Sequence, residues 1–189
     1  MDRLAGGVWR EEYPKPAHEC AIIHSIIQKV NPDILALQEI GEIPYLYDLW
    51  RDLNITGIGN YRYSFWVKGE DNEQRHLSLL SRLPIHAKLA HLDLEFSYFG
   101  NTTRPRRGLM EVEFHTKGKT WRLFNLHLKS KWTERDDDPQ AANLREKEAR
   151  VIRDFIRKKY PPQADSLHLV VGDFNDFKST SPIRRFQKV

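Results

Sequence analysis

Three polar side chains follow directly on a short apolar run near the end of the chain. The run, 168–172, is long enough for a buried strand and too short for a helix, and Asp173, Asn175 and Asp176 come after it. Residues two apart in an extended chain share a face, so Asp173 and Asn175 are predicted to point at one ligand. A carboxylate beside an amide suits a hard cation and a phosphate oxygen, or a water that must lose a proton. The alternative is a strand end whose Asp and Asn cap a turn, with Asp176 as a turn residue.

A second carboxylate, Glu39, stands at the end of another apolar run, 33–40. An unpaired carboxylate at the end of a buried strand is costly, and a metal ion is one way to compensate it. A salt bridge to an arginine is the other, and it is the commoner arrangement. Both remain open from this run alone.

The segment 125–130 supplies an imidazole. Asn125, His127 and Lys129 share one face of a predicted strand, where His127 can donate to a phosphate or act as a general acid. A structural histidine and a solvated lysine are the alternatives. Arg107 stands at the start of the predicted hairpin whose second strand carries His127, and its guanidinium matches phosphate geometry, although most arginines in basic loops are simply surface residues.

Alternating helices and strands must position these residues. Helical spacing predicts helices over 17–30, 44–53 and 140–159, and short apolar or alternating runs predict strands over 33–40, 61–67, 76–81, 85–92, 109–114, 120–128 and 168–172. Residues 1–16 are predicted to be an irregular lead-in, 96–107 a loop with three arginines, and 133–139 a solvated acidic loop. We therefore expect an α/β fold, a layered sandwich of mixed sheets flanked by helices.

Length and composition indicate one globular domain over residues 1–189. The chain is 40% hydrophobic and 30% charged, and no apolar run reaches the roughly 18 residues of a membrane span. Its start has no signal-peptide pattern, so a cytoplasmic location is expected by default. Cys20 is the only cysteine, which excludes an intrachain disulfide. The net charge of +4 is compatible with a polyanionic partner.

Four segments in this order carry a family resemblance: 31–39 (NPDILALQE), 80–85 (LSRLPI), 125–130 (NLHLKS) and 172–176 (GDFND). Together they resemble the endonuclease/exonuclease/phosphatase family of metal-dependent phosphodiesterases, which includes deoxyribonuclease I and exonuclease III. The resemblance spans about residues 17–183. It implies a layered α-β-β-α sandwich with one site at the strand ends.

The resemblance also implies a role for each candidate residue. Glu39 would bind Mg²⁺, with Mn²⁺ as an alternative ion, and Asp173 would bind the metal or take the proton of the attacking water. Asn175 would hold a phosphate oxygen and His127 would contact the scissile phosphate. Arg107 and Lys129 would bind the substrate phosphate.

Two parts of the family pattern find no match in this sequence. Family members usually begin with a strand that carries an asparagine of the site, and they end with a strand that carries an Asp-His pair. We therefore expect open strand edges and a homo-oligomer in which such edges meet.

A Mg²⁺-dependent nuclease, acting on DNA rather than RNA, is the leading prediction for function. The alternatives are a catalytically impaired module that binds nucleic acid or protein, and a phosphatase acting on a small phosphorylated substrate.

Overall fold

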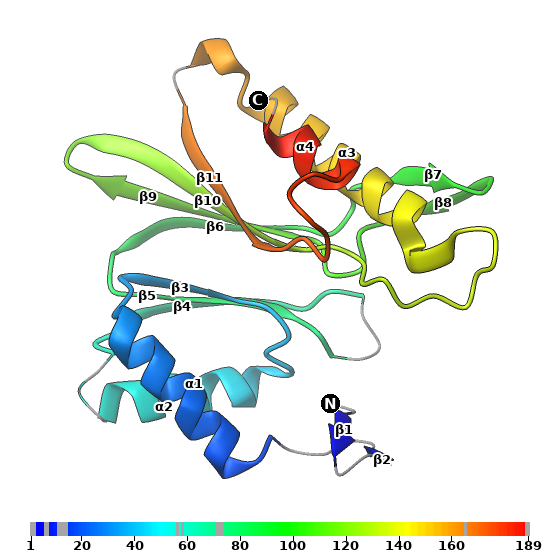
Figure 1. Ribbon diagram of the computed structural model, residues 1–189. Helices are drawn as coiled ribbons and strands as arrows, with labels where there is room; N and C mark the ends of the chain where they lie inside the picture. Colours follow the sequence, from blue (N-terminus) through cyan, green and yellow to red (C-terminus); the bar gives the residue numbers. More distant parts are fainter. Residues whose placement is uncertain are drawn as a thin grey trace. The chain divides into compact units, whose positions relative to one another are not determined.

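The computed structural model describes residues 3–5, 8–10, 15–55, 57, 59–70, 74–164 and 166–187 (Figure 1). The chain divides into two compact units, Met1–Pro84 and Ile85–Val189, and each is described by itself. The expectation of a single domain over 1–189 stays a prediction.

The first unit opens with a small hairpin. Strands β1 (Arg3–Ala5) and β2 (Val8–Arg10) pair antiparallel, with Leu4 opposite Trp9. The prediction of an irregular lead-in was wrong for these residues, because two short runs separated by Gly-Gly are a hairpin signal. Residues 1–2, 6–7 and 11–14 of that lead-in lie outside the described residues.

Two helices cover one face of a three-stranded antiparallel sheet in this unit (Figure 1). The sheet has the order β3 (Ile34–Leu37), β5 (Leu77–Ser81), β4 (Tyr63–Val67), and the helices are α1 (Ala17–Val30) and α2 (Ile43–Ile55). The helices and sheet share one core, made of Ile27, Leu46, Leu53, Tyr61 and Leu80. Apolar spacing thus predicted both helices, since each must bury a stripe against the sheet.

Only part of the apolar face predicted for α1 is covered. Ile23 and Ile27 pack against the core of the unit, whereas Ile22, Ile26 and Val30 are more than half exposed. The helix ends as expected at Asn31, which is left-handed (φ 49°) and donates its backbone N–H to the carbonyl of Ile27 at 2.8 Å.

The second unit is built on a four-stranded mixed sheet. Its order is β11 (Leu167–Asp173), β10 (Lys119–His127), β9 (Leu109–Thr116), β6 (Ile85–His91), with β10 and β11 parallel and the other pairs antiparallel. Helices α3 (Ala142–Lys159) and α4 (Ser181–Gln187) cover one face (Figure 1). The core of the unit comprises Leu109, Phe124, Leu126, Leu128, Ala149, Ile152 and Ile156.

The segment predicted as a loop at 96–107 contains a second small hairpin. Strands β7 (Phe96–Tyr98) and β8 (Asn101–Thr103) pair antiparallel. Phe96 and Tyr98 are partly buried and Ser97 is exposed, an alternation too short to stand out in the sequence.

The prediction of a fully solvated acidic loop at 133–139 was wrong for Asp138, which is 3% exposed. Its carboxylate accepts hydrogen bonds from the backbone N–H groups of Asn143 and Leu144, at 2.9 and 3.0 Å, and from the hydroxyl of Tyr98 at 2.8 Å. These bonds satisfy the first turn of α3, whose N–H groups have no partner within the helix. One side chain thus fixes both the start of α3 and the β7–β8 hairpin.

Each unit contributes a sheet with a helix layer on one face, so the predicted mixed α/β fold with sheets flanked by helices is confirmed. Short 3₁₀ turns at Pro139–Ala141 and Pro162–Ala164 flank α3. Among the described residues, no helix combines the length and the apolar character needed to cross a membrane.

Candidate functional site

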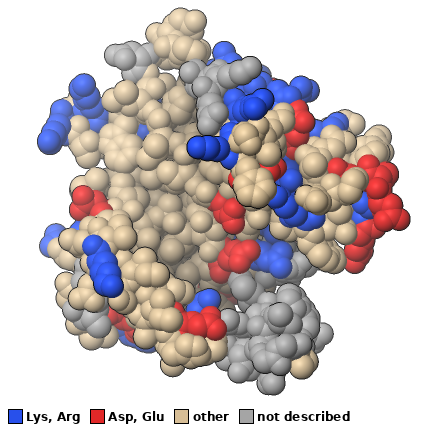
Figure 2. All heavy atoms as spheres, in the orientation of Figure 1, with Lys and Arg blue, Asp and Glu red and all other residues tan. Residues whose placement is uncertain are grey.

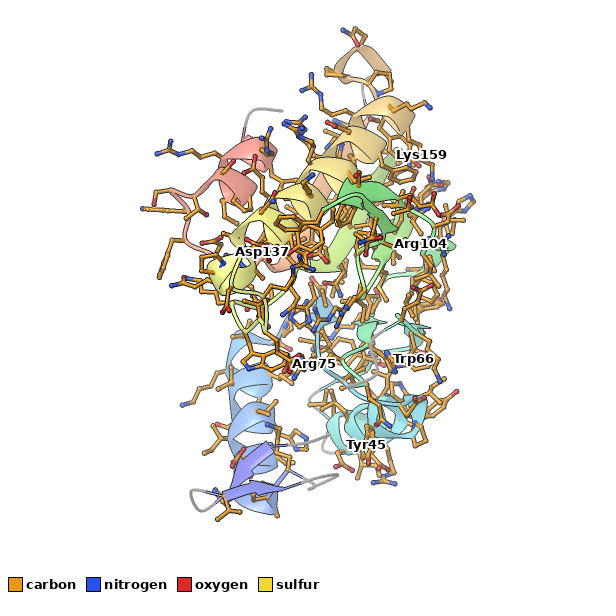
Figure 3. All side chains as sticks on the ribbon, turned by 90° about the vertical axis from the view of Figure 1, so that its right-hand side faces the viewer. Tyr45, Trp66, Arg75, Arg104, Asp137 and Lys159 are labelled. Carbon is orange, nitrogen blue, oxygen red and sulfur yellow. The ribbon has the colours of Figure 1, made fainter. Side chains whose placement is uncertain are left out.

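Glu39 lies two residues beyond the end of β3 in the first unit. Its backbone is left-handed (φ 57°), and its side chain is 48% exposed. One carboxylate oxygen lies 3.6 Å from Nε of Arg75, which Figure 3 labels. The salt bridge considered from the sequence is therefore present. A half-exposed carboxylate remains accessible to a cation as well.

The turn that follows Glu39 is held by residues that the sequence analysis did not select. The indole N–H of Trp66 donates to the carbonyl of Gly41 at 3.0 Å, and the rings of Trp66 and His76 meet edge to face. Glu42 lies 3.3 Å from Nζ of Lys68 and 3.4 Å from Nε2 of His76. Although burial acts in the opposite direction, these two groups lower the pKa of Glu42. The end of β4 and the residue before β5 thus hold the segment that follows Glu39.

His127 and Asp173 lie directly opposite each other at the carboxyl ends of two parallel strands in the second unit. The register pairs His127 of β10 with Asp173 of β11. Paired residues point to the same face, and their backbones are about 4.8 Å apart. Ligands of α/β proteins gather where parallel strands end. His127 itself is 4% exposed, whereas Asp173 is exposed.

The strand ends at Asp173, so the expectation of an extended chain that sets Asp173 and Asn175 on one face was wrong, while the binding of one ligand by both stays a prediction. Asn175 is left-handed (φ 51°), and its backbone N–H donates to Oδ1 of Asp173 at 2.8 Å, which closes an Asx turn. Its Nδ2 donates to the carbonyl of Leu128 at 2.9 Å. The turn considered as the alternative is therefore present, and it holds the carboxamide against the segment that follows His127.

Gly172 permits the close approach of the two strands. Its φ is +137°, and a Cβ atom there would lie 1.9 Å from the carbonyl oxygen of Leu126. No side chain fits in that space. The glycine before Asp173 thus sets the spacing of β10 and β11 at the strand ends.

The first turns of α3 bring two buried charged residues against this end of the sheet. Arg145 donates from Nε to Oδ2 of Asp176 at 2.8 Å and from Nη1 to the backbone carbonyl of Gln140 at 2.9 Å. A longer bond of 3.3 Å reaches the carbonyl of Lys129. Asp176, interpreted from the sequence as a turn residue, therefore also anchors the helix. Its other oxygen accepts the N–H of Phe177, as a turn residue would.

Glu148 is the second of these residues and is 2% exposed. Its carboxylate accepts the backbone N–H of Lys129 at 2.7 Å. Burial raises the pKa of Glu148 to about 7, although this N–H and the positive charges of Arg107, Lys129 and Arg106 act in the opposite direction. Sequence reasoning missed Arg145 and Glu148. The sequence signal for them is that both charged residues occupy positions of α3 that the helical spacing of its apolar residues directs inward.

The two predicted phosphate-binding cations are buried. Arg107 is 2% exposed, and its charge acts on Glu148. Lys129 is 8% exposed, and its Nζ donates to Oγ of Ser130 at 3.2 Å and to the carbonyl of Trp132. Their roles toward a phosphate stay predictions.

The second unit thus brings together His127, Asp173 and Asn175, with Arg107 and Lys129 on adjoining segments, while Glu39 belongs to the first unit. The family model described as "Endonuclease/Exonuclease/phosphatase family" matches residues 21–189. The chain belongs to this family. No curated protein sequence matches it.

Solved structures share the fold at low sequence identity. A family protein from Leptotrichia buccalis is 15% identical, with a TM-score of 0.66 over 94% of this chain and 68% of its own. Sphingomyelinase C from Streptomyces griseocarneus is 19% identical, with a TM-score of 0.65 over 90% of this chain and 61% of its own. A mutant beta toxin from Staphylococcus aureus with bound magnesium ions is 17% identical, with a TM-score of 0.64 over 90% of this chain and 61% of its own. The chain therefore spans about three fifths of the length of these last two proteins.

Proposed function

We propose that this protein is a Mg²⁺-dependent phosphodiester hydrolase, and specifically a nuclease that prefers DNA to RNA. The family consists typically of hydrolytic enzymes acting on phosphodiester bonds. The observation that carries the proposal for this chain is the register that sets His127 beside Asp173 at the ends of two parallel strands. An imidazole and a carboxylate at one such end supply an acid and a base for hydrolysis.

The available oxygen ligands fit a magnesium ion. Mg²⁺ keeps several waters and is usually held by one or two carboxylates. Glu39 and Asp173 are both carboxylates at strand ends, and neither is buried. We propose each of them as a magnesium ligand, and a solved relative contains bound magnesium ions. The ion would offset the negative charge of the phosphodiester and stabilise the charge that develops on its oxygens.

The residues of the chain would then divide the work at the phosphate. Asp173 accepts the proton of the attacking water. His127 donates a hydrogen bond to a phosphate oxygen, or a proton to the leaving oxygen. In the structure, Nδ2 of Asn175 donates to the carbonyl of Leu128. When substrate binds, this N–H group donates to a phosphate oxygen instead. Arg107 and Lys129 add positive charge beneath the phosphate, where their partial desolvation strengthens the field.

Charge supports an anionic substrate but does not define a single binding surface. The net charge is +4. Figure 2 shows Lys and Arg side chains in several groups on the face drawn, with Asp and Glu among them. The preference for a polynucleotide therefore rests on Arg104, Arg106 and Lys131, since Arg107 and Lys129 are buried.

The test is hydrolysis by the purified chain with Mg²⁺ on three substrates: plasmid DNA, a single-stranded RNA and sphingomyelin vesicles. We expect nicking of plasmid DNA that EDTA abolishes and that falls by at least about tenfold in Glu39→Gln and by more in His127→Ala. Asp48→Asn, which changes an exposed carboxylate on α2 of the same unit, is the matched control and should keep its activity.

Three other results of the hydrolysis assay would change the proposed function or the assigned residues. Faster hydrolysis of vesicles than of DNA would replace the nuclease with a lipid phosphodiesterase. Binding of DNA without hydrolysis of any substrate would replace it with a binding module. Activity that is unchanged in Glu39→Gln and His127→Ala would refute the assignment of these residues.

A further inference from the structure

Strand β6 carries one imidazole, His86, at a bulge. Ile85 pairs with Phe114 and Ala87 pairs with Glu113, and the register shifts between them, at His86. Because Ile85 and Phe114 share one face, alternation from this pair places His86 on the other face, together with Glu113 and His115. The rings of His86 and His115 stack, with centroids 3.8 Å apart and an interplanar angle of 23°.

Two imidazoles and a carboxylate form a cluster beside this bulge. Oε1 of Glu113 lies 3.7 Å from Nε2 of His86 and 3.3 Å from Nε2 of His115. One ligand atom from each residue lies within 4.8 Å of the other two. In a tetrahedral zinc site with metal–ligand distances of 2.0–2.2 Å, the ligand atoms are about 3.4 Å apart. We propose that His86, Glu113 and His115 bind Zn²⁺, with water completing the coordination.

The surroundings suit a partly open metal site. The side chains of His86 and His115 are 57% and 48% exposed, so the rings can adjust and a water has room. The guanidinium of Arg122 donates to Oε2 of Glu113, which leaves Oε1 directed at the two imidazoles. Such a bond to the far side of a ligand fixes its orientation. The positive charge of Arg122 also repels a cation, so the site binds zinc less tightly than a buried structural site.

This cluster is separate from the proposed phosphodiesterase site. Glu113 pairs with Arg122 of β10, and His127 lies five residues further along that strand. Five residues span about 17 Å, and the odd number places His127 on the opposite face of the sheet. The ligand chemistry also differs, because imidazole suits zinc whereas carboxylates and water suit magnesium.

Zinc at this position would join β6 to the β9–β10 hairpin. His86 comes from one strand, and Glu113 and His115 come from the next, close to the hairpin turn at Lys117 and Gly118. A metal that binds only the folded chain stabilises it in proportion to the logarithm of metal concentration over its Kd. The inferred role is therefore a structural clip at the end of the sheet remote from His127.

Titration calorimetry of the tag-free full chain with Zn²⁺ tests the inference, with His86→Ala, His115→Ala and the double variant. We expect one zinc equivalent to bind the wild type, at least about tenfold weaker binding in either single variant, and loss of this event in the double variant. The melting temperature should rise with Zn²⁺ in the wild type and not in the double variant. His18→Ala removes an exposed imidazole from α1 and should behave as the wild type does.

Two results would overturn the proposal. One is the absence of a binding event in the wild type at millimolar Zn²⁺. The other is a double variant that binds zinc and gains thermal stability as the wild type does. Melting curves recorded without zinc show whether each variant is folded, and both side chains are exposed enough that we expect no loss of fold.

Discussion

The buried carboxyl group of Glu148 should make the folded protein less stable as pH rises, and glutamine at this position should remove that dependence. Glu148 is 2% exposed and accepts the N–H of Lys129 at 2.7 Å. A glutamine oxygen can accept the same hydrogen bond, but glutamine does not ionise. Glu148→Gln therefore isolates the cost of a charge that burial opposes.

The size of the effect follows from the pKa. Burial raises the pKa of Glu148 from 4.5 to about 7, so between these values the folded state holds a proton that the unfolded state has released. The unfolding free energy therefore falls as pH rises from 4.5 through 7, and it is constant above that range. At 1.36 kcal/mol per pKa unit, the full loss is about 3 kcal/mol. Glutamine contributes nothing over the same range.

The assay is urea unfolding of wild type and Glu148→Gln at pH values from 5 to 8. The stability of Glu148→Gln relative to the wild type should rise by about 2–3 kcal/mol across this range. Glu146→Gln is the matched control on the same helix. A hydrogen bond from Arg185 lowers the pKa of Glu146, so that its carboxyl group is ionised throughout and the difference from wild type should be flat. A flat difference for Glu148→Gln as well would refute the reasoning.

Two further predictions concern the strand ends and edges. Gly172→Ala should lower the free energy of unfolding by roughly 3 kcal/mol or more and abolish any hydrolysis, because the added Cβ would meet the Leu126 carbonyl oxygen. A variant with an unchanged urea midpoint would contradict this. We also propose that exposed edges of β3 and β11 pair between copies, since among the described strands both lie at sheet edges and Leu167 and Leu169 are about half exposed. Light scattering after gel filtration should then give at least twice 22.3 kDa, and a monomer at micromolar concentration would contradict it.

Local patterns in the sequence predicted the elements that carry the site. Each apolar run ending in polar residues proved to be a strand, and the helical spacing of 17–30 gave α1 with its bounds unchanged. The side-chain geometry at the strand ends was less predictable. Asn175 and Glu39 both adopt left-handed backbones just past a strand, and alternation carries no information once the strand has ended. Asp173 and Asn175 therefore form a turn and do not lie on one face of an extended strand.

The remaining features depend on contacts between segments distant in sequence. His86 joins Glu113 and His115 through the pairing of β6 with β9, and nothing in the run 85–92 marks the partner strand or the bulge. In the sequence, Asp138 does not differ from the other members of its acidic run. Only the tertiary fold gives it bonds to Tyr98 and to the start of α3. Such pairings follow from the register and the tertiary fold, which a periodic pattern does not specify.

The polar end of α3 explains how an irregular loop can hold a fixed geometry next to His127. Arg145 bonds to Asp176 and to carbonyls of Lys129 and Gln140, so it links α3 to the segments that follow β10 and β11. Apolar residues in these positions would often give equal or greater stability, since burying charges is costly. They could not, however, satisfy the backbone groups of the loops beside His127 and Asp173. The buried charges therefore position the proposed site, with Arg145 orienting the loop after Asp173 and Glu148 orienting the one after His127.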